Sequence, residues 1–337
     1  MSPLTRQNRC NGIWAPIELS YLTIAVSAVF ALVTVTGNVL IILVVIKLFH
    51  HESRKTFMIL VVNLAVADLL VGVVVEPLSI ATHVLESLKT NMTDFQTAEH
   101  VSYFLSCSVS IFTLSILALD RFFAVSRPIW YWNHVTLTKV KVVVILVWFF
   151  CIIFTALYFE IGFVLFLFVF ANAAVAVTMF ISFSTYILTL RRAKVSGRIF
   201  SLDQAQGQCY DRHQKTENAA IRQKAKREEK LTKIFLIMLL FVLLFYLPSC
   251  VMMYMINLCS TCSCALIHWL RDIQFFFIWA NSAVNPAIYA LRLPPFRRAF
   301  MNLIGCRRAG NIVNFETNVG GDHWCNTLYN FNGDVPI

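Results

Sequence analysis

Residues 142–190 read VVVILVWFFCIIFTALYFEIGFVLFLFVFANAAVAVTMFISFSTYILTL and contain a single charged residue, Glu160. As one helix this stretch would be about 73 Å long at 1.5 Å per residue. That is more than twice the roughly 30 Å thickness of the hydrocarbon core of a bilayer, so the chain must fold back on itself. Glu160, which favours water, and Gly162, which relaxes the backbone, mark the turn. The stretch therefore predicts two membrane-spanning helices joined by an unusually short loop.

The composition indicates that lipid, rather than water, surrounds most of the chain. Of the 337 residues, 58% are hydrophobic and only 14% are charged, and the mean hydropathy is +0.69. The surface of a soluble protein of this size would need more charge. Apolar runs of the roughly 20 residues that cross a bilayer lie near 20–46, 57–82, 100–119, 142–158, 162–190, 234–257 and 269–291. We predict an all-α membrane protein, a seven-helix bundle over residues 20–291.

The distribution of basic residues predicts how the bundle lies in the membrane. Of the 28 Lys and Arg residues, 24 lie in segments 47–56, 121–141, 191–233 and the tail from 292. The positive-inside rule places these segments in the cytosol and the N-terminal residues 1–19 outside the cell, in a multi-pass protein of the plasma membrane. Binding of nucleic acid by the basic stretch 222–233 is the weaker alternative to this topological explanation, and no nucleic-acid partner is expected.

Residues 292–306 are predicted as a short interfacial helix that follows the seventh span. Its apolar side chains recur at i, i+4 and i+7, as Phe296, Phe300 and Leu303. Such an amphipathic segment lies in the membrane surface. Cys306 at its end is a candidate palmitoylation site, and residues 307–337 form a cytoplasmic tail.

Four of the ten cysteines fall on the predicted outer side, namely Cys10, Cys259, Cys262 and Cys264. Disulfides are favoured over a metal site, because the segment CSTCSC supplies only three thiols in an oxidising compartment. Three pairings remain open. The preferred one joins Cys259 to Cys264 and Cys10 to Cys262, since geometry disfavours the closest pairs. Asn91, in Asn91-Met92-Thr93, is a glycosylation candidate on the same side.

The carboxylate of Asp68 lies inside the second span, where an ionisable group costs about 2.5–3.5 kcal/mol on insertion scales. Such a residue usually faces the interior of the bundle. Polar side chains of other spans are available to meet it there: Asn38, Ser110, Asn281, Ser282 and Asn285. Oxygen ligands around one carboxylate suit a hard monovalent cation or an ordered water cluster. The alternative is interhelical hydrogen bonding that only holds the bundle together.

The predicted cytosolic ends of the spans collect groups that suit a two-state switch. Asp120 and Arg121 close the third span, and Glu228 opens the sixth on the same side. Tyr186 and Tyr289 lie near the inner ends of the fifth and seventh spans. An arginine can exchange partners among these carboxylate and phenol oxygens. The alternative is a static cation that snorkels to the membrane surface.

The motifs Gly37-Asn38, NLAVADLL, DRF, Trp148, FYLP and NPAIY, in this order on the expected spans, resemble those of rhodopsin-like (class A) G-protein-coupled receptors. The resemblance covers about residues 20–306. It implies that an extracellular ligand opens a cytosolic cleft for a heterotrimeric G protein, with arrestin as a further partner and no enzymatic activity. It also implies that Asp120 and Glu228 restrain Arg121 at rest. The polar residues around Asp68 then resemble the family's allosteric sodium pocket, and no other cofactor is expected.

Departures from the family pattern resemble the melanocortin branch, with its cannabinoid, adenosine and lysophospholipid relatives. Gln96 stands where the family usually has the Cys that tethers the third span, and Thr178 stands near the place of the usual fifth-span Pro. NHVT after the third span and CSTCSC before the seventh fit melanocortin receptors best. The calcium carboxylates of melanocortin receptors are not reproduced, so no bound calcium is expected.

The predicted ligand pocket is apolar and aromatic, as small-molecule sites tend to be. Its wall consists of Tyr103, Phe104, Cys107, Tyr246, Met253, Phe275 and Trp279. Tyr103 stands where amine receptors of the family carry an Asp, so a simple biogenic amine loses its usual counter-ion. Six acidic residues give the outer mouth a negative balance, which mildly favours a cationic or peptide ligand, and two of them, Glu76 and Glu99, are counted among the ligand-binding residues. We nevertheless expect all the acidic side chains of the mouth to face water: Glu76, Glu86, Asp94, Glu99, Glu160 and Asp272.

The ligand stays open between a melanocortin-like peptide, a lipid and a purine, and three other functions remain as alternatives. One is an opsin-like receptor, which needs a Lys for a retinal Schiff base, and none lies between 269 and 291. Another is a constitutively active orphan receptor. The third, from a different class, is a small seven-span transporter. A transporter needs a polar track through the membrane, and the polar residues of the predicted spans cluster in the inner half.

Overall fold

The computed structural model describes residues 10, 13–48, 55–161, 237, 240–259, 261–292 and 294–303, with short helical pieces between 176 and 191. Most of the predicted fifth span, 162–190, falls outside these residues. Three residues predicted to have functional roles also fall outside: Tyr186, Glu228 and Cys306.

The regular structure in the described residues is helical throughout. The helices are α2 (Ile17–Leu48), α3 (Lys55–Leu70), the π-helical turn η1 (Val71–Val75), α4 (Glu76–Ser87), α5 (Thr93–Ser126), α6 (Pro128–His134), α7 (Leu137–Ala156), α8 (Tyr158–Ile161), Leu240–Leu258, α11 (Cys264–Arg292) and α12 (Pro294–Leu303). Five helical segments are long and apolar enough to span a membrane, with α3, η1 and α4 counted as one. The first four of these segments extend beyond the predicted apolar runs at both ends, because backbone hydrogen bonding continues into the interfacial regions.

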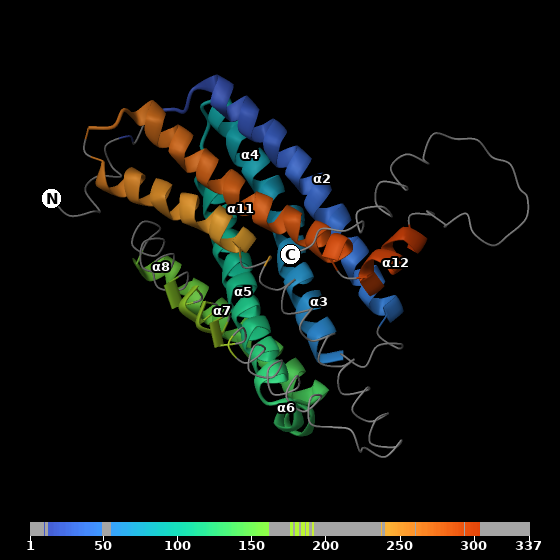
Figure 1. Cartoon of the computed structure of the whole chain (residues 1–337). Coiled ribbons are helices and arrows are strands. Elements are labelled where there is room, and N and C mark those ends of the chain that lie inside the picture. The colour runs from blue at the N-terminus through green and yellow to red at the C-terminus, as the bar shows by residue number, and fades with distance from the viewer. Residues whose placement is uncertain are drawn as a thin grey trace, which may run out of the picture.

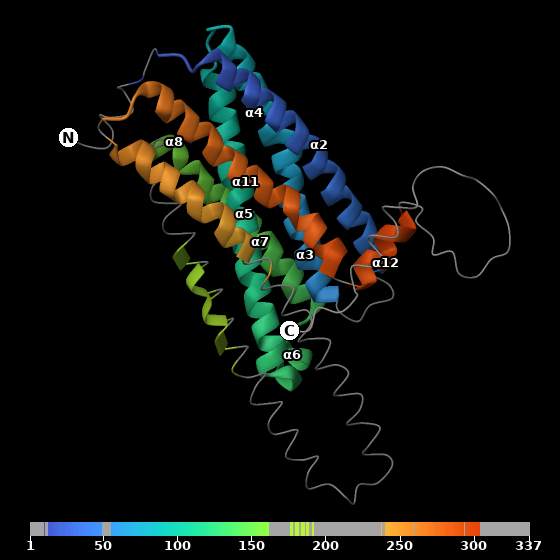
Figure 2. The same cartoon turned by 45° about the horizontal axis from the view of Figure 1, so that its top comes forward.

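The helices form one bundle with α5 through its centre. α2, α4 and α11 lie side by side (Figures 1 and 2), and α7 packs on α5. We call the end that carries Cys10 and Cys264 the disulfide end, and the opposite end, which carries α6, the Arg121 end. α12 crosses beside α2 at the Arg121 end, where Phe296 is buried against Tyr289 with ring centroids 5.9 Å apart. A helix is therefore present over most of the predicted segment 292–306, beginning two residues later than expected, and its position in the membrane surface stays a prediction.

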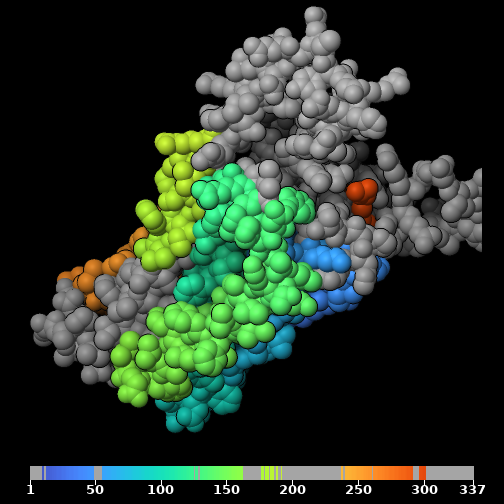
Figure 3. Space-filling model, turned by 90° about the horizontal axis from the view of Figure 1, so that it is seen from below, coloured from blue at the N-terminus to red at the C-terminus, as the bar shows by residue number. Residues whose placement is uncertain are grey.

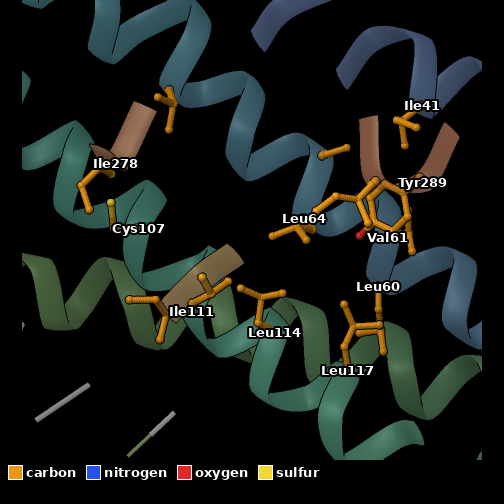
Figure 4. Close-up of a cluster of buried hydrophobic side chains, with 14 of the residues drawn as sticks. Ile41, Leu60, Val61, Leu64, Cys107, Ile111, Leu114, Leu117, Ile278 and Tyr289 are labelled. Atoms are coloured by element: carbon orange, nitrogen blue, oxygen red, sulfur yellow. The ribbon is translucent and has the colours of Figure 1, made fainter. Parts of the chain in front are cut away.

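The apolar core fills the space between α2, α3, α5 and α11. Figure 4 shows side chains of these helices, such as Leu64, Leu114 and Tyr289, turned toward one another. Lipid offers no hydrophobic drive for such contacts, so dense van der Waals packing and interhelical hydrogen bonds hold the helices together. Trp148 of α7 provides one of these bonds by donating to Asn63 Oδ1 at 2.8 Å.

The outward faces of the helices carry the side chains that lipid favours. α7 buries only Val140, Cys151 and Thr155, whereas Ile145 and Phe149 are more than 60% exposed. Figure 3 shows the face on which the green surfaces of α6 and α7 lie beside the blue surface of the first spans. An exposed apolar belt of this kind is expected where the solvent is hydrocarbon.

α2 and α11 meet at intervals of seven residues on both helices. Thr23 Oγ1 donates to Asp272 Oδ2 at 2.9 Å, and the Phe30 and Trp279 rings lie 6.5 Å apart. A Cβ on Gly37 would come within 2.9 Å of the Pro286 ring. The three pairs are therefore 23/272, 30/279 and 37/286, a repeat typical of helices that cross at a shallow angle. Only glycine permits the closest of these approaches.

The disulfides join Cys10 to Cys264 and Cys259 to Cys262, so the preferred pairing was wrong. The four cysteines are those expected. The error lay in the rule that closely spaced cysteines do not pair. The chain turns at the end of the Leu240–Leu258 helix, where Cys259 N–H still bonds Met255 O, and this turn brings the Cα atoms of Cys259 and Cys262 to 5.6 Å. That separation lies within the range of ordinary disulfides.

We expect the two disulfides to contribute unequally to stability. Cys10–Cys264 closes a loop of sequence separation 254, whereas Cys259–Cys262 closes one of 3. Longer loops constrain the unfolded chain more, and loss of a native disulfide typically costs about 2–5 kcal/mol. Replacing Cys10 and Cys264 together by Ser should therefore lower the thermal midpoint more than replacing Cys259 and Cys262. Cys250→Ser, at a free thiol, is the control, and equal losses for the two pairs would contradict the expectation.

Candidate functional site

The residues of the predicted ligand wall lie together and are buried. The Tyr103 ring is 5.1 Å from Phe275, and Phe275 stacks on Trp279 at 6.0 Å. Cys107 lies next to both Tyr103 and Tyr246. Phe104 and Met253 are also buried. α5, α11 and the Leu240–Leu258 helix thus bring one aromatic wall together in the half of the bundle nearer the disulfides.

A buried ion-pair network lies beyond this wall, toward the disulfide end. Arg271 Nε donates to Asp272 Oδ1 at 2.7 Å, and Arg271 Nη2 lies 3.2 Å from Glu86 Oε2. The carboxylates of Asp272 and Glu86 are almost fully buried, with exposed fractions of 0% and 2%. Because Arg271 contacts both, a single guanidinium fork joins α4 to α11.

His83 completes the network with a second cationic group. Its Nε2 lies 3.1 Å from Asp272 Oδ2 and 3.9 Å from Glu86 Oε2, and its Nδ1 lies 2.9 Å from Ser79 O. Both ring nitrogens therefore face acceptors. Only the doubly protonated ring donates to both, so the geometry suits an imidazolium.

The buried face of α2 supplies hydroxyl groups to the same network. Ser20 Oγ donates to Glu86 Oε2 at 3.3 Å, and Thr23 donates to Asp272. The expected clustering of polar residues in the inner half alone was therefore wrong, because the buried polar face continues to the disulfide end. Sequence analysis missed Ser20, Thr23, His83 and Arg271. The available signal was the recurrence of small hydroxyl residues at helical spacing in the first span: Ser20, Thr23, Ser27 and Thr34.

The expected solvation of the acidic residues holds for some and fails for others. Asp94 and Glu160 are exposed. Four were expected in water but are buried: Glu76, Glu86, Glu99 and Asp272. Arg271 and His83 compensate two of these carboxylates. Within the described residues, neither Glu76 nor Glu99 forms an ion pair. The disulfide end therefore holds more buried negative than positive groups.

The position of Glu76 follows from a local change of helix type. Pro77 lacks an N–H, so the chain makes the π-helical turn Val71–Val75, in which Glu76 N–H bonds Val71 O. Gly72 lies so close to α2 that a Cβ there would come within 2.8 Å of Val35. The turn directs Glu76 into the bundle, where its exposed fraction is 0%. In the sequence, Pro77 directly after Glu76 was the signal for this turn.

The structure brings together part of the predicted sodium pocket. Asn285 Nδ2 donates to Asp68 Oδ2 at 2.8 Å, and Ser282 lies next to the same carboxyl group. Asp68 Oδ1 has no hydrogen-bond partner among the described residues. Asn38 instead donates to two backbone carbonyls, Thr34 O and Ser282 O, and so ties α2 to α11. Ser110 and Asn281 are buried, but no direct bond joins them to Asp68 in the described part.

At the Arg121 end, Arg121 Nε donates to Asp120 Oδ2 at 3.0 Å, and its guanidinium lies 4.9 Å from the centre of the Phe57 ring. Sequence analysis missed Tyr131 of α6, whose hydroxyl donates to Asp120 Oδ1 at 2.6 Å and also lies 3.2 Å from Thr56 Oγ1. Burial raises the pKa of Tyr131, so the phenol keeps its proton.

Tyr289, the other predicted switch residue among the described ones, is buried near Asp68, and its hydroxyl makes no hydrogen bond to described residues.

The glycosylation candidate Asn91 is exposed in the turn between α4 and α5. Its Oδ1 accepts from Thr93 N at 3.0 Å and from Thr93 Oγ1 at 2.8 Å. The sequon is thus accessible, and its modification stays a prediction.

We expect Arg271→Gln to destabilise the bundle, because it leaves Glu86 and Asp272 without their shared cation. Removing one partner of a buried ion pair typically costs about 3–5 kcal/mol. Arg271 is 21% exposed, which places the expected loss at or below the low end of that range. The thermal unfolding midpoint measures the effect, with the exposed Lys89→Gln as control. An unchanged midpoint for Arg271→Gln would show that the network contributes no stability.

Comparison with known proteins agrees with this arrangement. Residues 37–289 match the family described as 7 transmembrane receptor (rhodopsin family). A D(5)-like dopamine receptor of Takifugu rubripes is 25% identical over 97% of this chain and 78% of its own length. Trace amine-associated receptor 7e of Rattus norvegicus is 31% identical over 83% of this chain and 81% of its own. These relatives do not confirm the melanocortin branch, which stays a prediction. The chain belongs to the rhodopsin family of seven-transmembrane receptors, and it is a receptor of the membrane rather than an enzyme.

Proposed function

We propose that this chain is a G-protein-coupled receptor for a cationic, amine-bearing ligand that binds from the disulfide end. The observation that carries the proposal is the pair of buried carboxyl groups, Glu76 and Glu99, neither of which forms an ion pair with a cation of the described residues. Uncompensated negative charge beside an aromatic wall attracts a cation with apolar surface. Tyr103 and Phe275 belong to that wall.

The relatives support the same ligand class. They include dopamine receptors and trace amine-associated receptors, as their names state. The chain has Tyr103 where amine receptors of the family have an Asp, so an amine needs a counter-ion elsewhere. Glu99 lies one helical turn before Tyr103 on α5, and Glu76 lies on the neighbouring span. A basic peptide of the melanocortin type is the second candidate, because the same negative charge attracts it.

The disulfide end then faces the extracellular side of the plasma membrane, and the Arg121 end faces the cytosol. The excess of Lys and Arg in the segments that the sequence predicts to be cytosolic supports this orientation, because one of these segments, 121–141, follows α5 at the Arg121 end. Disulfides at the other end agree with an oxidising compartment. A heterotrimeric G protein binds at the Arg121 end, with arrestin as a further partner.

A sodium ion at Asp68 is the regulatory part of this proposal. Asp68 Oδ1 lacks a partner among the described residues, while Ser282 and Asn285 lie against the carboxyl group. A monovalent cation suits this oxygen-rich, buried position.

The decisive experiment measures second messengers in cells that express the full chain. Dopamine and 2-phenylethylamine are compared with the neutral 2-phenylethanol, and with panels of basic peptides, lipids and purines. We expect saturable responses to amines and none to the neutral analogue. A response confined to peptides, lipids or purines would overturn the amine assignment, and equal responses in untransfected cells would remove the receptor from the explanation.

We expect Arg121→Ala to abolish signalling and Tyr131→Phe to raise signalling without ligand. Tyr131 holds Asp120, and Asp120 holds Arg121, so loss of the phenol hydroxyl loosens the restraint. Second-messenger levels normalised to surface expression measure both effects, with Tyr21→Phe at an exposed position as control. Normal signalling by well-expressed Arg121→Ala would contradict the switch.

We expect the agonist affinity of the wild type to fall as sodium rises, because the ion favours the inactive arrangement. Asp68→Asn should abolish this dependence, whereas the exposed Asp94→Asn should keep it. The measurement is agonist binding in sodium chloride against choline chloride at equal ionic strength. A wild type that is insensitive to sodium would leave the Asp68 group a structural one.

A further inference from the structure

Glu76 of α4 and Trp279 of α11 both lie beside one turn of α2, the turn that carries Phe30. We call this height in the bundle the Phe30 level. α2 runs antiparallel to the segment formed by η1 and α4. Ser20 bonds Glu86, and Thr34 lies against Gly72, so the two contacts are separated by the same number of residues on both segments. Phe30 of α2 therefore lies at the level of Glu76. The heptad register of α2 with α11 places Trp279 at the same level, where its ring contacts Phe30.

The polar atoms of this level lack partners. Within the described residues, no atom is placed to hydrogen-bond either carboxylate oxygen of Glu76 or the indole Nε1 of Trp279. Thr34 lies near the Glu76 carboxyl group without the geometry of a bond. The hydroxyls of Ser27 and Ser79 lie about one turn farther toward the disulfide end and make no hydrogen bond of good geometry within the described residues, although the Ser79 hydroxyl lies next to Glu99. All of these side chains have an exposed fraction of 0%. Orphaned buried groups of this kind require an occupant or a rearrangement.

The chemistry of the level suits an ammonium group. A carboxylate provides the opposite charge, two hydroxyl oxygens accept N–H bonds, and the Trp279 and Phe30 rings offer π faces to a cation. A carboxylate enclosed away from water without a cation is unfavourable by several kcal/mol, so a ligand that supplies the cation gains from the pairing.

We propose that Glu76, together with Trp279 and Phe30, binds the ammonium group of the ligand. The inference rests on the proposed function and names the counter-ion that replaces the one missing at Tyr103. The rings of Tyr103, Phe275 and Trp279 follow one another at 5.1 and 6.0 Å, so the aromatic wall leads directly to this level. The aromatic part of the ligand lies along the wall, and its ammonium group lies between α2 and α4.

Glu99 is the other buried glutamate without an ion pair among the described residues, and its surroundings differ. It lies within electrostatic reach of His83 and Arg271, which reduce its need for a further cation. No cationic side chain among the described residues acts on Glu76 in this way. The two glutamates therefore form a matched pair for mutation, because the same isosteric change tests each.

The experiment measures thermal unfolding of the purified full chain in lipid nanodiscs, with dopamine, 2-phenylethylamine or 2-phenylethanol added over a concentration series. We expect both amines to raise the unfolding midpoint of the wild type, and the neutral alcohol to leave it unchanged. Glu76→Gln should weaken the amine effect at least tenfold in concentration, and Glu99→Gln by less than threefold. Trp279→Phe, which keeps a ring but removes the indole, should weaken it to an intermediate degree.

The outcomes separate this inference from the proposed function. Amines that stabilise wild type and Glu76→Gln equally would overturn the Glu76 site and leave the amine receptor standing. A tenfold loss in Glu99→Gln alone would assign the counter-ion to Glu99. A wild type that neither amine stabilises would overturn both proposals. If Glu76→Gln fails to fold, Phe30→Leu and Trp279→Phe decide the matter, since unchanged amine stabilisation in both would contradict the site.

Discussion

Carboxylates buried between membrane-spanning helices need partners, and the arrangement of α2, α4 and α11 follows from this constraint. Asp272 and Glu86 would be strongly unfavourable alone. Arg271 and His83 neutralise them, and Ser20 and Thr23 complete their hydrogen bonds. The partners come from three helices, so the network forms only when all three are in register. Charge compensation thereby sets the levels at which the helices meet.

The register set at the disulfide end extends through the bundle. Seven residues below the 23/272 contact, Phe30 meets Trp279, and seven residues farther Gly37 meets Pro286. The absence of a Cβ at Gly37 permits the close approach that the next residue, Asn38, uses to reach Ser282 O. α11 therefore carries the ion-pair network, the aromatic wall and the bond to Asp68 on one continuous helix.

The sequence predicts features that depend on local pattern, and it fails where a partner lies on a distant span. The helices follow from apolar runs, and the contact of Arg121 with Asp120 follows from adjacency. Asp68 and Asn285 were grouped because polar residues within spans face inward, and they do bond. The burial of Glu86 and Asp272 could not be predicted in this way. Thr23 is 249 residues from Asp272, and Arg271 is 185 residues from Glu86, so only the contact of Arg271 with its neighbour Asp272 is local, and nothing in the local pattern distinguishes a paired rim charge from a solvated one.

We propose that ligand binding at Glu76 is transmitted to Asp68 through α11, which carries both Trp279 and Asn285. An ammonium group between Glu76 and Trp279 changes the forces on α11 two turns before Pro286, a residue that cannot continue the helical hydrogen bonding of its own turn. Asn285, next to Pro286, holds Asp68 through one bond. A small rotation of α11 about this proline changes that bond while the close Gly37 contact keeps α2 and α11 together. We propose that the bistable element is the Asp68–Asn285 pair, whose two arrangements would differ in whether a sodium ion completes the carboxylate.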